Sequence, residues 1–365
     1  MQSSKEKNNL KAVFRAAFFL LTFGTIIGLT SCNNPKGNDG GQTTETEKPD
    51  SIKADTTNTI ENLTQSIRED PRNADLYYQR SQLYALEEKF GPAVTDIDIA
   101  IKLDSLQPDY YVRQAEYFIY NAQPNTALSA LEKCLKIFPE NTDVLLKKAE
   151  IHLFLREYGK AQLVLRDVAL INNDLAEIYF LEGLIRLENQ DTVGAVKSLQ
   201  IAVEKEPDFY KGYVTLGRVN AQQFNDLAID YYKAAIDIMP DSYEARYNLA
   251  LYYQDREMIE DAEEQYNYII DNISQSIANP YYNMGYINMI YRQDFKAAVE
   301  WFTRAIEKEP TYLEAWYNRG FCHEILGELK AARDDYKKSL EIKSDYALSI
   351  KGISRIEQGE PYRIK

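Results

Sequence analysis

A repeat of about 34 residues runs through most of this 365-residue chain and limits what the chain can fold into. Its clearest mark is a column of alanines spaced 33 to 36 residues apart: Ala93, Ala127, Ala161, Ala195, Ala228, Ala262, Ala298 and Ala332. A unit of this length forms one supersecondary element, which cannot bury its apolar face alone. Successive units must therefore stack and share a continuous core, so the spacing predicts a solenoid.

Two further columns keep their distance from the alanines. About twelve residues earlier stands a small residue: Ser81, Ala115, Ala149, Gly183, Gly217, Ala250, Gly285 and Gly320. Four residues later stands a large apolar one: Ile97, Leu131, Leu165, Leu199, Tyr232, Tyr266, Phe302 and Tyr336. Small residues let backbones approach closely, and large ones fill the space that remains. We number each repeat so that these columns are positions 8, 20 and 24.

The repeat resembles the tetratricopeptide repeat (TPR) family, whose pattern is an aromatic residue, Leu-Gly, Tyr, Ala, an aromatic residue and Pro over 34 residues. The segments AWYNRGFCHEILGELKAARDDYKKSL (315–340) and RYNLALYYQDREMIEDAEEQYNYII (246–270) match it closely. The resemblance covers residues 59–358. It implies an all-α fold, a right-handed α-solenoid of about eight repeats that each pair a helix A with a helix B.

The columns also give the boundaries of the expected domain. Full repeats are expected near 74–107, 108–141, 142–175, 176–209, 210–242, 243–276, 278–312 and 313–346. Residues 59–71 fit a leading helix B, residues 347–358 a capping helix A, and residues 359–365 a tail. The spacing is one residue short near 222–228 and extended near 288–295. Ordinary drift, a change of superhelical angle or a contact loop would each account for these irregularities.

The first 31 residues have the composition of a signal peptide. A basic segment is followed by an apolar run at 16–29, which is shorter than the roughly 20 residues that a membrane-spanning helix needs. The run closes with LTSC (29–32), which resembles the lipobox of bacterial lipoproteins and implies that Cys32 is lipidated and anchors the chain to a membrane. The alternatives are a signal anchor or an ordinary cleavable signal with an incidental cysteine.

A polar segment at 32–58 follows, rich in Gly, Pro, Thr, Asn and Asp. Because such a composition buries little apolar surface, we expect a disordered linker. In the lipoproteins that this segment resembles, an Asp after the cysteine often favours retention in the inner membrane, whereas this chain has Asn33 there. The expected location is therefore the outer membrane of the bacterial cell envelope, in a periplasmic or surface-facing position. The formal charge of −14 argues against nucleic acid as a partner.

The stretch FCHE (321–324) sets a cysteine beside a histidine and a carboxylate, as a catalytic or metal site would. In the repeat frame, however, His323 and His152 both occupy position 11, which aromatic residues fill in other repeats. Cys134 stands in a column that also holds alanines, six repeats away from Cys322. These residues are therefore expected to be core packing. The sequence predicts no enzyme activity, catalytic residue, metal or cofactor.

In the TPR family, the A helices line a concave groove, mainly through positions 2, 5, 9, 12 and 13. Carried onto this chain, the resemblance places nine aromatic residues there: Tyr78, Tyr120, Phe154, Phe180, Tyr247, Tyr282, Tyr286, Tyr317 and Phe321. Acids at position 2, such as Asp75, Asp109 and Asp143, also complement the helix dipole whatever the function. The acids proposed for the groove at the other positions are Glu116, Glu150, Glu188 and Glu324.

These residues suggest a groove that captures an extended or helical protein segment, and its acids would favour a segment with Lys or Arg. The chain would then be a lipid-anchored scaffold or adaptor for other cell-envelope proteins. The alternative is a surface lipoprotein that captures a glycan or another ligand by stacking on the aromatic residues. A clamp for C-terminal carboxylates is not expected, because that specialisation uses Lys and Asn at positions 5 and 9, where this chain begins with Tyr78 and Gln82.

Overall fold

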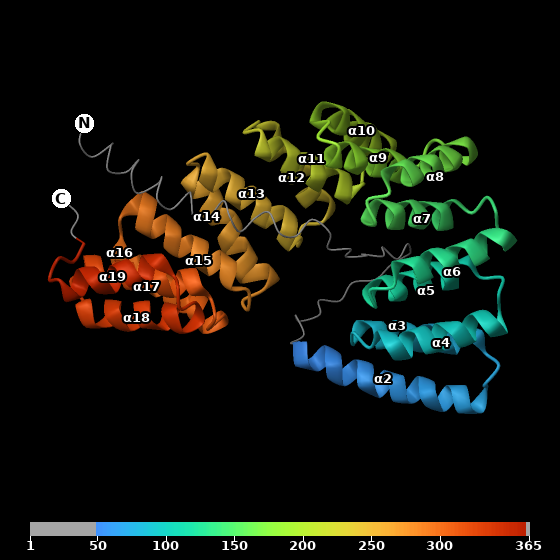
Figure 1. Cartoon of the computed structure of the whole chain (residues 1–365), viewed down its shortest axis with the longest axis horizontal. Helices are drawn as coiled ribbons and strands as arrows, with labels where there is room; N and C mark the ends of the chain where they lie inside the picture. Colours follow the sequence, from blue (N-terminus) through green and yellow to red (C-terminus); the bar gives the residue numbers. More distant parts are fainter. Residues whose placement is uncertain (1–48, 363–365) are drawn as a thin grey trace. The chain divides into compact units, whose positions relative to one another are not determined.

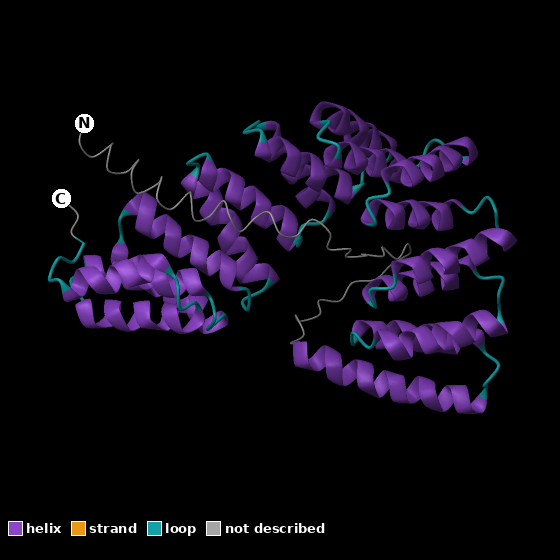
Figure 2. Ribbon diagram, viewed as in Figure 1, coloured by secondary structure: helices purple, strands orange, loops and turns teal. Residues whose placement is uncertain are grey.

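The computed structural model describes residues 49–362, and their side chains from residue 59 onward. Within that part every regular element is helical, which confirms the all-α expectation (Figure 2). No helix among the described residues is long and apolar enough to cross a bilayer. The predicted signal peptide, Cys32 and the linker up to residue 48 lie outside the described residues.

Each repeat forms two helices, and the A helices begin at the same residues as the eight repeats. The elements in order are α2 (Pro49–Glu69), α3 (Ala74–Leu86), α4 (Phe90–Leu103), α5 (Pro108–Tyr120), α6 (Pro124–Ile137), α7 (Thr142–Phe154), α8 (Tyr158–Ile171), α9 (Ala176–Glu188), α10 (Thr192–Lys205), α11 (Tyr210–Gln222), α12 (Leu227–Ile238), α13 (Tyr243–Asp255), α14 (Ile259–Tyr268), η1 (Ile269–Ile273), α15 (Ala278–Ile287), η2 (Asn288–Arg292), α16 (Phe295–Lys308), α17 (Leu313–Ile325), α18 (Leu329–Ile342) and α19 (Ala347–Glu357).

The described chain divides into two compact units after Pro207. The N-terminal unit contains α2 to α10 and the C-terminal unit contains α11 to α19, and within each unit consecutive helices lie side by side (Figure 1). The eight alanines of position 20 are at most 1% exposed in both units. A residue without a long side chain is needed there because helix A and helix B of the same repeat meet at this column.

The turn between helix A and helix B has the same form in most repeats. After α3, for example, Glu88 adopts a left-handed conformation with φ of 57°, and the Lys89 N–H donates to the Tyr84 carbonyl. This is a Schellman motif, which satisfies carbonyls at the end of the helix. Glycine normally occupies the left-handed position, but here it does so only at Gly327 in the last full repeat; the other turns use Glu88, Ala122, Arg156, Gln190, Phe224, Glu257 and Gln293.

The first described helix is longer than the sequence indicated. Helix α2 begins at Pro49, whereas the solenoid was expected to begin at residue 59, so residues 49–58 are helical rather than linker. Composition alone did not indicate this helix, because the segment is polar and includes two adjacent threonines. Yet proline is well suited to the first position of a helix, and neither proline nor glycine interrupts the chain again before Pro71.

The extended spacing that leads into the seventh repeat is explained by two π-helical segments. Ala262 and Ala298 are 36 residues apart, two more than the usual 34. Each π segment accommodates an extra residue within its helix. One segment is η2, which lies within the predicted stretch at 288–295, and the other is η1 at the end of the preceding helix B. The missing residue of the fifth repeat belongs to the start of α12, which has 12 residues where α10 has 14.

Candidate functional site

In the N-terminal unit, several of the predicted groove aromatics reach the surface. Tyr120 and Phe154 occupy the same position in adjacent repeats and are 48% and 39% exposed. Tyr120 also stacks on Phe90 with ring centroids 4.8 Å apart, which holds its ring in place. Tyr78 is half-buried against Tyr110. Phe180 is also half-buried and belongs to the edge of the core around α7, α8 and α9.

The acids of this unit are partly neutralised by bases that the groove positions did not include. Glu116 accepts from Arg113 Nη1 at 2.7 Å and lies 3.2 Å from Lys147 Nζ, which in turn donates to Glu150 at 2.6 Å. Burial works to lower the pKa of Lys147, but the carboxylates of Glu150 and Glu116 outweigh it and the pKa is raised. Arg113 and Lys147 share position 6 of the second and third repeats, so this pair of bases could have been found in the sequence by including that position.

The third predicted acid, Glu188, lies at the end of α9. It accepts a hydrogen bond from the Tyr158 hydroxyl at 3.0 Å. The N-terminal unit therefore offers aromatic surface bordered by a ladder of alternating acids and bases, and not a purely acidic groove.

In the C-terminal unit, most of the predicted groove aromatics belong to the core. Tyr282, Tyr317 and Phe321 are 6%, 6% and 4% exposed, while Tyr247 and Tyr286 are half-buried. Their burial follows from contacts with residues that come later in the chain, in the connection to the next repeat or beyond it. The rings of Tyr282 and Tyr312 stack with their centroids 4.8 Å apart. Such contacts leave little of the Tyr282 ring exposed to a partner.

The buried tyrosine hydroxyls of this unit are paired with asparagines one repeat later. Asn283 Nδ2 donates to the Tyr247 hydroxyl at 3.0 Å, and Asn318 Nδ2 donates to the Tyr282 hydroxyl at the same distance. Burial raises the pKa of Tyr247 and Tyr282 far above the usual range, so both hydroxyls stay protonated. These groups hold repeats together.

Glu324, the last predicted groove acid, is also internal. It is 1% exposed and accepts hydrogen bonds from Arg355 Nε and Nη2 at 2.9 and 2.7 Å and from the Tyr336 hydroxyl at 2.6 Å. The backbone N–H of Tyr362 adds a fourth at 2.7 Å, while the Tyr362 ring lies 5.2 Å from Phe321. Burial acts to raise the pKa of Glu324, but its hydrogen bonds outweigh burial and the pKa is lowered. The carboxylate thus fastens the cap and the tail to the last repeat.

Of the FCHE stretch in α17, Phe321, Cys322 and Glu324 are buried and His323 is half-buried. Cys322 is fully buried, and burial raises its pKa well above the ordinary thiol value. His152 Nδ1 lies 2.7 Å from Glu157, and His323 Nδ1 makes the same contact with Glu328, five residues later in each case. Among the described residues, no three His, Cys, Asp or Glu side chains gather in a way that would hold a metal.

Comparisons with known proteins agree with this repeat architecture. Family models described as tetratricopeptide repeat match residues 119–183 and 313–346. The C-terminal part of a TPR repeat-containing protein from Cytophaga hutchinsonii is similar in structure, with a TM-score of 0.55, 17% identity, and coverage of 66% of this chain and 99% of that one.

Two curated relatives are similar in sequence over shorter segments. Human mitochondrial import receptor subunit TOM70 is 28% identical over 181 residues, which cover 46% of this chain and 29% of that protein. Uncharacterized protein MJ0572 of Methanocaldococcus jannaschii is 34% identical over 65 residues, covering 18% of this chain and 74% of that protein. The chain thus spans less than a third of the import receptor's length.

Proposed function

Because this chain belongs to the tetratricopeptide repeat family, we propose that it is a scaffold that binds a segment of another protein along its A helices. The observation that carries this proposal is the pair Tyr120 and Phe154. These are large aromatic side chains, exposed at the same position of adjacent repeats. Exposed aromatic residues on a rigid surface anchor partners efficiently, because little side-chain entropy is lost when they are covered.

The N-terminal unit is the better candidate for this surface. Its helices α5 and α7 present the two aromatic residues beside the ladder of Arg113, Glu116 and Lys147. A partner segment would therefore meet apolar anchors flanked by charges of both signs. Such charges select partners and set their orientation more than they add affinity.

We propose further that the scaffold works in the bacterial cell envelope, anchored by lipid on Cys32 at the outer membrane, and that its partners are envelope proteins. The support is the lipobox-like LTSC at 29–32 after a short apolar run. Replacing Cys32 with Ala should move the protein from the membrane fraction to the soluble fraction. A variant that stays tightly membrane-bound would show that the apolar run itself is the anchor.

The binding proposal is tested by crosslinking in cells followed by purification of the tagged protein. We expect that the double variant Tyr120→Ala, Phe154→Ala loses a protein partner that the native chain retains. Phe224→Ala is the matched control, because Phe224 is 58% exposed but lies in a turn of the C-terminal unit. If all three proteins capture the same partners, the aromatic pair is not the binding surface, and capture of a glycan in their place would support the alternative reading.

A further inference from the structure

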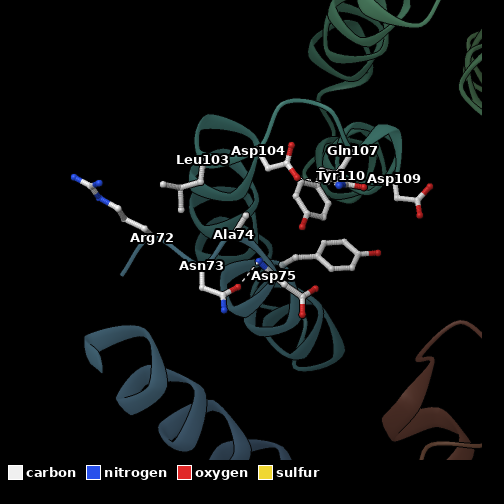
Figure 3. Close-up of a pocket in the computed structure, with 10 residues that line it drawn as sticks. Arg72, Asn73, Ala74, Asp75, Leu103, Asp104, Gln107, Asp109 and Tyr110 are labelled. Carbon is white, nitrogen blue, oxygen red and sulfur yellow. Dashed lines mark hydrogen bonds between the residues drawn. The ribbon is translucent and has the colours of Figure 1, made fainter. Parts of the chain in front are cut away.

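A pocket of about 600 Å³ lies where α3, α4 and α5 meet in the N-terminal unit (Figure 3). A volume of this size is typical of ligand sites. The residues that line it are mostly polar or acidic: Arg72, Asn73, Ala74, Asp75, Tyr78, Leu103, Asp104, Gln107, Asp109 and Tyr110. Tyr78, one of its walls, is a predicted groove aromatic on α3, the A helix of the first repeat.

The side chains that line the pocket carry more negative than positive charge. Three carboxylates line it against a single base, Arg72, whose side chain extends away from them (Figure 3). Asp104 is held by the Leu106 N–H and the Gln107 side chain, which lower its pKa and keep it ionised. No ion pair within the described part of the chain involves Asp109, so its charge faces solvent unopposed.

Tyr110 is the residue that distinguishes this pocket from an ordinary acidic surface. Its side chain is 8% exposed and lies against Tyr78, with ring centroids 4.8 Å apart. Its hydroxyl points to the side on which Asp75 lies, and no hydrogen bond from this hydroxyl to another described residue is present (Figure 3). Burial raises the pKa of Tyr110, and the charges of Asp75 and Asp104 raise it further. The hydroxyl oxygen itself is not among the buried atoms that lack a partner, so a donor that enters the pocket can reach it.

We propose that this pocket receives an arginine side chain of the protein segment that the scaffold binds, an inference that rests on the proposed function. A guanidinium group offers five planar donors, which suit the Asp75 and Asp109 carboxylates together with the Tyr110 hydroxyl. The Tyr78 and Tyr110 rings add faces on which a guanidinium can stack. Arg113 is already paired with Glu116 at 2.7 Å and does not fill this role.

Asp75 and Asp109 also lie in the first turns of α3 and α5, where any carboxylate stabilises the helix. The chain supplies a control for that general role. Asp143 occupies the same position in α7, the A helix of the third repeat, and does not line the pocket. A variant at Asp143 therefore removes the helix-end charge without touching the pocket.

The test uses a short synthetic peptide that carries one arginine beside a benzophenone photocrosslinker, and a second peptide in which neutral citrulline replaces the arginine. Each is crosslinked to the full chain in a neutral detergent, and adducts are located by mass spectrometry. We expect adducts within residues 72–110 for the arginine peptide. Citrulline, or the double variant Asp75→Asn, Asp109→Asn, should reduce their yield at low peptide concentration by about tenfold, the scale expected for a charged hydrogen bond. Tyr110→Phe should reduce it several-fold, and Asp143→Asn should leave it within about twofold.

Equal yields from the two peptides would overturn the proposal, and so would an equal loss from Asp143→Asn. The outcome is separable from that of the scaffold proposal. If the cellular partner is lost with Tyr120→Ala, Phe154→Ala but no peptide adduct forms at 72–110, the scaffold stands and the arginine pocket falls. If the adducts form as expected while the aromatic variant keeps its partners, the pocket stands and the aromatic surface falls.

Discussion

The two units build the same repeat from different core chemistry. At position 24 the N-terminal unit uses Ile97, Leu131, Leu165 and Leu199, whereas the C-terminal unit uses Tyr232, Tyr266, Phe302 and Tyr336, and all eight are at most 2% exposed. The aromatic rings need more room, and three of the four repeats in that unit provide it with glycine at position 8. A Cβ on Gly217 would lie 2.6 Å from Tyr232, and one on Gly285 would lie 2.7 Å from Phe302.

The aromatic core also introduces buried hydroxyls, which need partners. Tyr266 donates to Gln254 Oε1 at 3.2 Å, and Tyr336 donates to Glu324. The position-24 residues of the N-terminal unit are aliphatic and carry no such requirement. Most of the predicted groove aromatics of the C-terminal unit are therefore covered by packing, whereas Tyr120 and Phe154 of the N-terminal unit remain at the surface.

The largest expected effect comes from removing the buried carboxylate of the C-terminal unit. Glu324→Ala should lower the free energy of unfolding of this unit by about 3–5 kcal/mol, because Arg355 and Tyr336 lose their buried partner. Both tryptophans, Trp301 and Trp316, belong to this unit, so tryptophan fluorescence during urea unfolding isolates its transition. An unchanged midpoint would mean that the Glu324 network adds nothing to stability.

The same carboxylate predicts a pH dependence. Since the pKa of Glu324 is lowered in the folded state, its stabilisation is present above the unfolded-state pKa and is lost as the pH falls through the folded value. Below about pH 4 the native C-terminal unit should therefore lose stability faster than the Glu324→Gln variant does. Parallel losses in the two proteins, followed by tryptophan fluorescence, would contradict this assignment.

A smaller effect is expected where glycine faces an aromatic ring. Gly217→Ala should destabilise the C-terminal unit by about 1–3 kcal/mol, because the new methyl group overlaps Tyr232. Gly159→Ala in α8 is the matched control, since a Cβ there meets nothing within 4 Å; it should stabilise by about 0.5–1 kcal/mol as a helical glycine is removed. Urea unfolding followed by circular dichroism would compare the two, and equal effects would refute the packing argument.

Removing one core hydroxyl should have an effect of about 1 kcal/mol. Tyr266→Phe keeps the ring but leaves Gln254 Oε1 without its donor. Leu199→Ile, at the same position of the N-terminal unit, changes shape without touching a hydrogen bond. If Tyr266→Phe proves neutral in urea unfolding, the hydroxyl contributes nothing to the aromatic core.

The smallest expected effect concerns the turns. Gln190 has a φ of 63°, a conformation that glycine adopts without strain, so Gln190→Gly should stabilise the N-terminal unit by up to about 1 kcal/mol. Gly327→Ala in the C-terminal unit, where φ is 80°, should destabilise by a similar amount. A loss of stability on Gln190→Gly, measured by thermal unfolding, would show that the side chain contributes more than the backbone strain costs.

The sequence was sufficient for the repeat architecture because the spacing of small and large residues reports directly on helix packing. The residues at positions 8, 20 and 24 pack against one another within a repeat and against its neighbour, so their spacing fixes where each repeat starts. Each A helix begins at the first residue of its counted repeat. The π segment η1 could not be located in this way. A spacing of 36 residues shows that two residues are added between Ala262 and Ala298, but not which helix absorbs each one.

The candidate site was less predictable because exposure depends on residues outside the family pattern. Tyr282 and Tyr78 share position 5, yet Tyr282 is covered by Tyr312, which lies in a connection between repeats. Glu324 is covered by Arg355 and by the tail at Tyr362. Counting positions within the repeat places a side chain on one face of its helix. Residues that follow the repeat decide whether that face is covered.

The central claim is that a partner protein lies across the A helices of the N-terminal unit. The most direct measurement places a photocrosslinking amino acid at position 120, and in a second protein at position 224, and illuminates living cells. We expect a discrete adduct with one protein from position 120 and none from position 224. An adduct of the same protein from position 224 alone would contradict it and would move the binding surface to the C-terminal unit.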